Sequence, residues 1–406
     1  MKTALIAIGL LASTATTVAF YPSGTSLIGH GTEINVTAGG ELAGVNPLTL
    51  QRPQIEVVFV LDTTSSMGGL IEAAKEKIWS IATTMASAQP APEIKMGLVA
   101  YRDRGDSYIT RVVDLSTDLD SMYATLMDFQ PVGGGDGPES VNQALADAVQ
   151  KISWSENSNA YKVVFLVGDA PAHMDYQNDV KFPVSIAAAK NKGIVVNAIR
   201  CGTDPHTQQQ WQHIAELGGG RYFDVNQSGD AVVIATPFDK ELATLSEELD
   251  KTRMYYGSAK EKAKQALKVD ASRKLHKSSS LASRARRATF NASVSGAGNF
   301  LGENELVDDI ASGRVEFSTV APESMPAALQ SMAPAEQEAA IKESAERRND
   351  LRAQVQRLAQ QRKDYLKQEI DAVGGAATSL DDKIDSAVRE QAEQKGMRYE
   401  SDTPDY

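Results

Sequence analysis

Short apolar runs alternate with longer amphipathic stretches between residue 55 and about residue 238. Six of the apolar runs are rich in β-branched residues and predict strands at residues 55–61, 94–101, 111–115, 161–167, 194–200 and 221–225. Several runs lack polar alternation, which is typical of strands that are covered on both faces. Apolar residues recur three and four apart in between, which predicts helices at residues 70–87, 118–129, 139–152, 180–193 and 207–220. The pattern therefore predicts an α/β fold with a doubly wound, mainly parallel sheet.

Beyond residue 238 the chain changes to long charged stretches, which predict a mostly helical C-terminal module over residues 247–373. Within it, Leu351, Val355 and Leu358 form a narrow apolar seam that continues to Tyr365 or Leu366. Two structures fit this seam: an amphipathic helix packed on its own domain, which we favour, and a short coiled coil for self-association. The polar residues 374–406 predict a tail.

The N-terminus has the pattern of a cleaved signal peptide. Residues 1–19 carry one lysine, an apolar run from residue 4 to residue 12, and a small-residue ending. The run is about half of the roughly 20 residues that a membrane-spanning helix needs. We therefore expect an exported protein in the periplasm, outside the cell or on its surface. Residues 20–53 are rich in Gly, Thr and Ser and predict an irregular lead-in.

Composition and charge exclude several classes of function. The 406 residues are 42% apolar, enough for one large core and a second module. The formal net charge of −12 repels nucleic acid and anionic lipid at long range. No Gly-rich phosphate-binding loop of the type that ends in Gly-Lys-Ser/Thr is present, so the sequence does not indicate nucleotide binding. A single cysteine, Cys201, leaves no internal disulfide.

Candidate chemistry begins at the end of the first predicted strand, in the stretch VVFVLDTTSSMGGL at residues 57–70. Asp62 ends the strand, and Thr64 and Ser66 follow at two-residue steps, which allows their oxygens to point to one side. Such hard oxygen ligands suit Mg²⁺ or Mn²⁺. The simpler alternative is that Asp62 caps the helix that follows.

Two further acidic loops are expected at the same sheet edge, because the carboxyl ends of parallel strands lie together. Asp169 follows the fourth predicted strand, and the Gly-rich stretch PVGGGDGPES brings Asp136 and Glu139 to the start of a helix. The three loops together predict a divalent-cation site. The nearby tripeptide Arg104-Gly105-Asp106 matches a motif read by integrins, but we expect this match to be fortuitous.

With these motifs, residues 54–246 resemble a von Willebrand factor A (vWA) domain with a metal-ion-dependent adhesion site. Asp62, Thr64 and Ser66 match the family's D-x-S-x-S loop with one conservative change, and Asp169 matches the third loop. The second loop, DGPES, resembles the acidic loop of the integrin β subunit. That resemblance implies Glu139 as a metal ligand.

The same comparison implies Asp136 as a further ligand and a neighbouring Ca²⁺ site that includes Asp103. In the family, an acidic residue of a partner protein completes the ion's coordination. A set of Asp62, Glu139 and Asp169 would surround the ion with three negative charges and weaken its attraction for that residue. The resemblance thus implies a non-enzymatic protein that recognises a macromolecule through its ion.

Two alternatives remain open. In the first, the ion is purely structural, and the C-terminal helical region is the interaction surface. In the second, Asp62 is the nucleophile of a phosphatase of the haloacid dehalogenase type. The second is disfavoured, because such enzymes need another acid two residues further on, where Thr64 stands.

Overall fold

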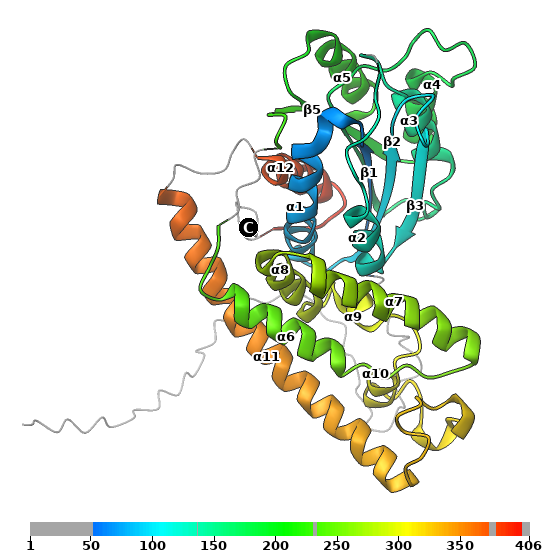
Figure 1. Ribbon diagram of the computed structural model, residues 1–406, viewed down its shortest axis with the longest axis vertical. Helices are drawn as coiled ribbons and strands as arrows, with labels where there is room; N and C mark the ends of the chain where they lie inside the picture. Colours follow the sequence, from blue (N-terminus) through cyan, green and yellow to red (C-terminus); the bar gives the residue numbers. More distant parts are fainter. Residues whose placement is uncertain (1–51, 136, 230–233, 373–378, 400–406) are drawn as a thin grey trace, which may run out of the picture. The chain divides into compact units, whose positions relative to one another are not determined.

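The computed structural model describes residues 52–135, 137–229, 234–372 and 379–399 (Figure 1). The predicted signal peptide and almost all of the lead-in lie outside these residues. A six-stranded sheet has the order β3-β2-β1-β4-β5-β6 and is parallel except for β3, which pairs antiparallel with β2 at one edge. The strands are β1 (Gln54–Asp62), β2 (Glu93–Tyr101), β3 (Thr110–Ser116), β4 (Tyr161–Gly168), β5 (Ile194–Cys201) and β6 (Gly219–Val225). All six predicted strands and the α/β fold class are confirmed.

Register places the candidate loops at one edge of the sheet. Central β1 pairs with β2 and β4, and its last residue, Asp62, lies opposite Tyr101 of β2. On the other side, Leu61 lies opposite Val167, so the loops that begin at residues 62, 102 and 169 leave neighbouring strands at the same level. Parallel pairing alone therefore brings the three segments together.

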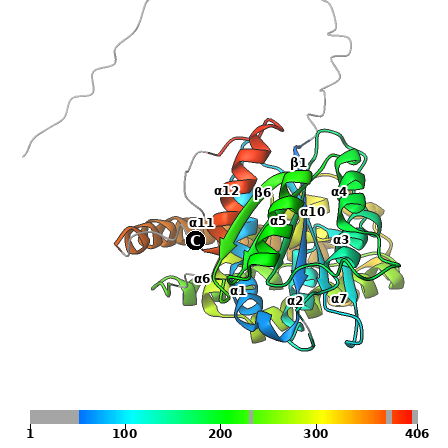
Figure 2. The ribbon, with the colours of Figure 1, turned by 90° about the horizontal axis from the view of Figure 1, so that it is seen from above.

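Helices cover both faces of this sheet, as Figure 2 shows from above. The side chains of β1 alternate between two cores: Phe59 and Leu61 belong to one, and Val58 and Val60 belong to the other. The first core contains α1 (Gly68–Ala86) and α2 (Leu119–Met127); the second contains α3 (Val141–Gln150), α4 (Phe182–Asn191) and α5 (Pro205–Leu217). This period of two follows from the pleat of a strand that is buried on both faces.

A helical module follows β6. Its helices are α6 (Asp239–Lys251), α7 (Ala259–Ser278), α8 (Leu281–Ala292), α9 (Ala297–Leu301), α10 (Leu306–Ala311) and the 39-residue α11 (Pro334–Ala372). Three short 3₁₀ turns are also present, at Ser65–Met67 (η1), Phe317–Thr319 (η2) and Pro322–Ser324 (η3). Leu351 and Val355 of α11 are buried in one cluster with Leu242 of α6 and Ala288 of α8. The seam of α11 thus packs within its own chain, as we favoured. No helix among the described residues is long and apolar enough to cross a membrane.

The prediction of a polar tail from residue 374 is wrong for residues 379–399. These contain α12 (Leu380–Glu393), in which Leu380, Ile384 and Val388 are buried in the same core as Phe59 and α1. Leu380, Ile384 and Val388 are four residues apart and form one apolar stripe on an otherwise charged helix. The polar composition of the segment as a whole does not reveal this stripe. The helical module is therefore inserted in the sequence between β6 and the helix that completes the sheet's first core.

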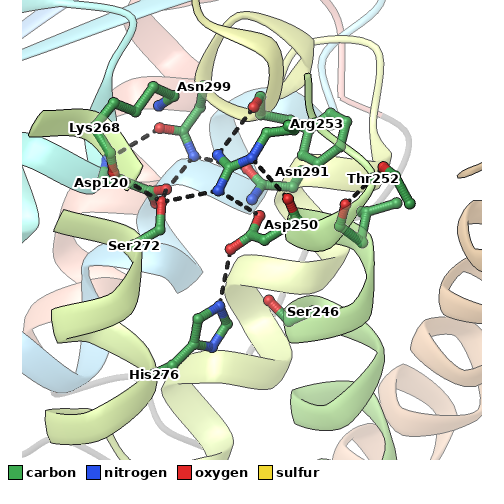
Figure 3. A network of polar contacts seen from close by, with 12 residues as sticks. Asp120, Ser246, Asp250, Thr252, Arg253, Lys268, Ser272, His276, Asn291 and Asn299 are labelled. Atoms are coloured by element: carbon green, nitrogen blue, oxygen red, sulfur yellow. Dashed lines mark hydrogen bonds and ion pairs between the residues drawn. The ribbon is translucent and has the colours of Figure 1, made fainter. Parts of the chain in front are cut away.

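A buried polar network, drawn in Figure 3, joins the helical module to α2 of the sheet domain. Arg287 of α8 donates from Nε to Oδ1 of Asp120 on α2 at 2.7 Å and lies 3.0 Å from Asp250 of α6. Ser272 of α7 donates to Asp120 at 2.7 Å, and His276 lies 2.8 Å from Asp250. Burial alone would raise the pKa of Asp120, but the Arg287 guanidinium holds that pKa well below its ordinary value.

Candidate functional site

The first candidate loop keeps the oxygens of Asp62, Thr64 and Ser66 close together. Asp62 is fully buried, and its Oδ1 accepts from the Thr64 amide at 2.9 Å and from Thr64 Oγ1 at 2.7 Å. Thr64 Oγ1 lies 3.3 Å from Ser66 Oγ, which is on the exposed 3₁₀ turn η1. Neither η1 nor α1 has a side-chain hydrogen bond at its N-cap, so helix capping does not explain this acid.

Glu139 reaches the same place from the loop before α3. Its amide donates to the Pro171 carbonyl at 2.8 Å, and its carbonyl accepts from the His173 amide at 3.1 Å, which ties it to the loop after β4. Gly134, in the same Gly-rich loop as Glu139, has φ +77°, and a Cβ there would be 3.0 Å from Glu139 Oε1 and 3.1 Å from Thr64 Cβ. A glycine at this position lets Glu139 and Thr64 approach from two sides.

Asp169 follows β4 and is half-buried. Its Oδ2 accepts from Gln227 Nε2 at 2.5 Å, and the same amide group donates to the Ser66 carbonyl at 3.1 Å. Gln227 thereby links the third candidate loop to the first. Sequence reasoning missed it, because a single amide in a polar loop after β6 carries no pattern of its own.

Two acids, Asp103 and Asp136, are expected at the Ca²⁺ site. Asp103 follows β2 and is buried; its Oδ1 accepts from Ser140 Oγ at 2.9 Å and its Oδ2 from the Tyr176 hydroxyl at 2.8 Å. Both of its carboxylate oxygens are thus engaged. Asp136 lies outside the described residues. The Ca²⁺ site stays a prediction.

Two buried carboxylate oxygens, Asp62 Oδ2 and Glu139 Oε2, have no hydrogen-bond partner among the described residues. Burial raises the pKa of Asp62 to about 7, and the Asp169 charge adds to this, while bonds from Thr64 and the charge of Arg102 oppose it. Burial, followed by the charges of Asp62 and other nearby acids, raises the pKa of Glu139 to about 9. Without a cation, both carboxyls therefore keep their protons to a higher pH than free carboxyls do, and a bound cation would favour their ionised forms.

These features suit a hard cation. Oxygen atoms from carboxylates and hydroxyls face one another, and a positive ion would satisfy the two orphaned oxygens. Within the described ranges, however, no three His, Cys, Asp or Glu side chains lie close enough to hold one ion by themselves. The hydroxyls of Thr64 and Ser66 are therefore needed, and the complete set of Asp62, Glu139 and Asp169 stays a prediction.

Tyr101 is a second residue that sequence reasoning missed. Its buried hydroxyl lies where a Cβ on Gly168 would be 2.5 Å away, and that same Cβ would be 3.0 Å from Asp62 Cβ. Burial, followed by the Asp62 charge, raises the pKa of Tyr101 well above its ordinary value. The sequence signal that could have identified Tyr101 is its position. It carries a polar group at the end of β2, directly before Arg102 and Asp103.

The Arg104-Gly105-Asp106 tripeptide is tied into the fold. Arg104 lies over the Tyr176 ring at 3.9 Å and pairs with Asp179, while Asp106 accepts from the Gly134 amide at 3.0 Å. Its two charged groups are therefore used within the chain.

Comparisons with known proteins agree with the fold. Residues 56–227 match the family model described as the von Willebrand factor A domain, so this part of the chain is a vWA domain. A 120-residue segment is 27% identical to alpha-protein kinase vwkA of Dictyostelium discoideum, a match that covers 29% of this chain and 19% of that protein. The chain thus spans less than a fifth of the length of this kinase.

Two solved structures are similar to part of the chain. Proximal thread matrix protein 1 (PTMP1) from the mussel byssus, with a zinc-occupied MIDAS motif, is 18% identical with a TM-score of 0.34, over 43% of this chain and 42% of that one. The SpRpn10 VWA domain is 15% identical with a TM-score of 0.33, over 45% of this chain and 100% of that one.

Proposed function

We propose that the vWA domain of this chain binds Mg²⁺ or Mn²⁺ at its sheet edge and uses the ion to recognise an acidic group of a macromolecular partner. The observation that carries the proposal is the pair of buried oxygens, Asp62 Oδ2 and Glu139 Oε2, that lack a hydrogen-bond partner within the described part of the chain. Such orphaned, like-charged atoms are costly unless a cation neutralises them.

Each of the three loops would contribute different ligands to the ion. Asp62 and the Thr64 and Ser66 hydroxyls would supply oxygens from one loop, and Glu139 and Asp169 would add charge from the other two. The ion supplies a positive charge that attracts an external carboxylate. Because several carboxylates already share that charge, we expect modest affinity for the partner. A neighbouring Ca²⁺ ion at Asp103 and Asp136 is part of the proposal, and each Asp103 oxygen would use its second lone pair for the ion beside its bond from Ser140 or Tyr176.

The proposal places the protein outside the cytoplasm, as the N-terminal pattern predicts, and assigns it no enzymatic activity. Support against the phosphatase alternative comes from Asp62 itself. Thr64 donates to its Oδ1, and the charged groups that act on it are Asp169 and Arg102. No lysine is among the groups that shift the pKa of Asp62 most strongly, whereas a phosphatase of this type needs a lysine to steady the aspartyl phosphate.

A second candidate function makes the ion structural and the helical module the binding surface. The observation in its favour is Leu267 on α7, a large apolar side chain that is 71% exposed. An exposed leucine alone is ordinary on a protein surface, so we rank this function second.

Metal binding is tested on the full chain with Mn²⁺ by electron paramagnetic resonance and calorimetry. We expect Mn²⁺ to bind and to be displaced by Mg²⁺, and we expect Asp62→Asn to abolish binding. The matched control, Asp147→Asn, removes another buried carboxylate that lies further along α3 and pairs with Lys151 at 2.9 Å; it should bind Mn²⁺ normally.

Partner recognition is tested by affinity capture from a cell-envelope extract. Proteins that EDTA releases from the wild type should be absent from Asp62→Asn. If both chains capture the same proteins and Leu267→Ser loses them, the helical module is the binding surface and the first proposal is wrong.

A further inference from the structure

A cavity of about 260 Å³ lies in the helical module, between α7 and the segment that follows η3. Its lining residues come from α7, from the segment between α6 and α7, and from residues 326–327, so none belongs to the candidate ion site. In other proteins, an apolar cavity of about 150 Å³ holds benzene. This cavity therefore has room for a ligand that is larger than one aromatic ring.

Most of the cavity wall is apolar. Ala266 and Val269 of α7 line it together with Tyr255, Pro326 and Ala327. The two alanines have short side chains and are exposed, so the fold leaves this space unfilled. A mainly apolar wall with a few polar groups is the usual form of a small-molecule site.

Contacts within the chain hold this wall in place. Lys262 of α7 donates from Nζ to the carbonyl of Glu323 at 3.1 Å and to that of Met325 at 3.3 Å. Met325 and Leu329, on either side of residues 326–327, are buried in one apolar cluster. The cavity is therefore preformed, and little ordering of the chain opposes the binding of a ligand.

Three charged side chains, Lys262, Asp270 and Arg273, line the same cavity. Along α7, the two cations and the apolar wall residues Ala266 and Val269 recur at spacings of three and four residues. This spacing places them on one face of the helix. The cavity thus combines an apolar wall with positive charge.

Both cations have N–H groups left for a ligand. The Lys262 ammonium has three donors, of which the two carbonyls use two. Arg273 donates from Nη1 to Asp270 at 3.0 Å, and the rest of its guanidinium carries further donors. The Arg273 and Asp270 side chains are 68% and 67% exposed, so water weakens this ion pair. Two cations against one acid give the cavity a net positive charge in a chain of net charge −12.

The charges and the apolar wall together select the chemical class of the ligand. An organic cation would meet an excess of positive charge. An inorganic anion would pair with Lys262 and Arg273 but would leave the apolar wall in contact with water. An organic anion with an apolar body satisfies both parts of the wall.

We propose that this cavity binds a small organic carboxylate that carries one aromatic ring or an apolar group of similar size. The carboxylate accepts from Arg273 and Lys262, and the apolar body covers Val269 and Tyr255. This inference goes beyond the proposed function, because it concerns a second site and a ligand that does not use the ion.

Fluorine NMR of the full chain in EDTA provides the test, with 4-fluorophenylacetate as the probe. We expect the probe to bind with millimolar affinity, as suits a ligand of this size. The neutral 4-fluorophenylacetamide and the cationic 4-fluorophenethylamine should bind about tenfold more weakly or not at all. Arg273→Gln should weaken binding of the acid about tenfold, whereas Lys277→Gln, an exposed cation of α7 outside the cavity, should leave it unchanged.

A filled cavity gives the sharpest control. Ala266→Phe should occupy the space and abolish binding of 4-fluorophenylacetate. Ala263→Phe adds the same side chain at an exposed alanine of α7 outside the cavity and should bind the probe as the wild type does. Urea unfolding of both variants shows that each is folded.

The opposite results would overturn the inference. It is wrong if 4-fluorophenylacetate does not bind the wild type, or if it binds Ala266→Phe equally well. Equal binding of the amide or the amine would remove the carboxylate, and displacement of the probe by an equal concentration of inorganic phosphate would mean a site for simple anions. Asp62→Asn should bind the probe normally, and Ala266→Phe should bind Mn²⁺ normally, so a failure of this inference and a failure of the proposed function are distinguishable.

Discussion

Replacing Asp62 with asparagine should stabilise the metal-free protein at alkaline pH, although it destroys the proposed ion site. Asp62 is fully buried, and its pKa rises from 3.8 to about 7 on folding. A carboxyl with a raised folded pKa costs no stability below its unfolded pKa. The cost grows as the pH rises and is complete above the folded pKa. At about 1.4 kcal/mol per unit, the full cost is about 4 kcal/mol.

Asparagine preserves the geometry that matters for folding. Its side-chain oxygen can still accept the two bonds from Thr64, which are 2.9 and 2.7 Å long in the wild type. Its amide nitrogen takes the place of the orphaned Oδ2 and lacks a described partner there, a penalty of about 1 to 3 kcal/mol that does not depend on pH. The penalty cancels when the stability difference between the wild type and Asp62→Asn is compared at two pH values. The change in that difference therefore reports the charge of Asp62 alone.

The assay is urea unfolding in EDTA at pH 5 and pH 8, followed by the same series in excess Mg²⁺. About 1.6 kcal/mol of the cost is present at pH 5 and about 4 kcal/mol at pH 8, so the wild type should lose about 2.5 kcal/mol relative to Asp62→Asn over this interval. Excess Mg²⁺ should restore the wild type and leave the variant unchanged. An equal difference between Asp62→Asn and the wild type at pH 5 and pH 8 would refute the charge-burial argument.

Three further predictions concern other parts of the structure. Arg287→Gln should lower the free energy of unfolding by about 3 to 5 kcal/mol in urea titrations, because it removes the guanidinium that pairs with the buried Asp120, whereas Asp250 keeps its ion pair with Arg253. Since Arg287 holds the pKa of Asp120 low, that difference should shrink as the pH falls below about 4. Gln227→Leu should weaken Mn²⁺ binding by about 10- to 100-fold in calorimetry, because it frees the ligand Asp169, while wild-type affinity would remove Gln227 from the site. Ile384→Ala should cost about 2 to 5 kcal/mol and the exposed Glu393→Ala close to nothing; equal values would mean that α12 does not complete the core.

The sheet was predictable from sequence, because its strands carry their own signal. Residues 57–61 and 163–167 are continuous apolar runs, mostly of β-branched and aromatic residues, as burial on both faces requires. The carboxyl ends of parallel strands lie at the same edge of a sheet. The acids at the ends of these runs, Asp62 and Asp169, were therefore expected at that edge. The candidate loops followed from topology alone.

Contacts between distant segments were not predictable. Gln227 meets Asp169 across 58 positions of sequence, and no local pattern marks an amide that will lie over a carboxylate. The stripe of Leu380, Ile384 and Val388 is visible in hindsight, but the charged residues between them resemble those of a solvated tail. Which polar-rich helix covers a core depends on the surface that it meets, and a single sequence does not display that surface.

The position of α12 in the chain determines when the core of the sheet can be completed during synthesis. Its residues close the core around Phe59 and Ile78, and a short bridge between Gln89 and Arg398 fastens the segment that follows it. A nascent chain can cover part of that face of its sheet with α1 and α2, but it cannot complete the burial until translation has passed residue 397, after the whole of the helical module has been made. During this interval the apolar face is exposed to other chains, so chaperone dependence should centre on the sheet domain rather than on the helices.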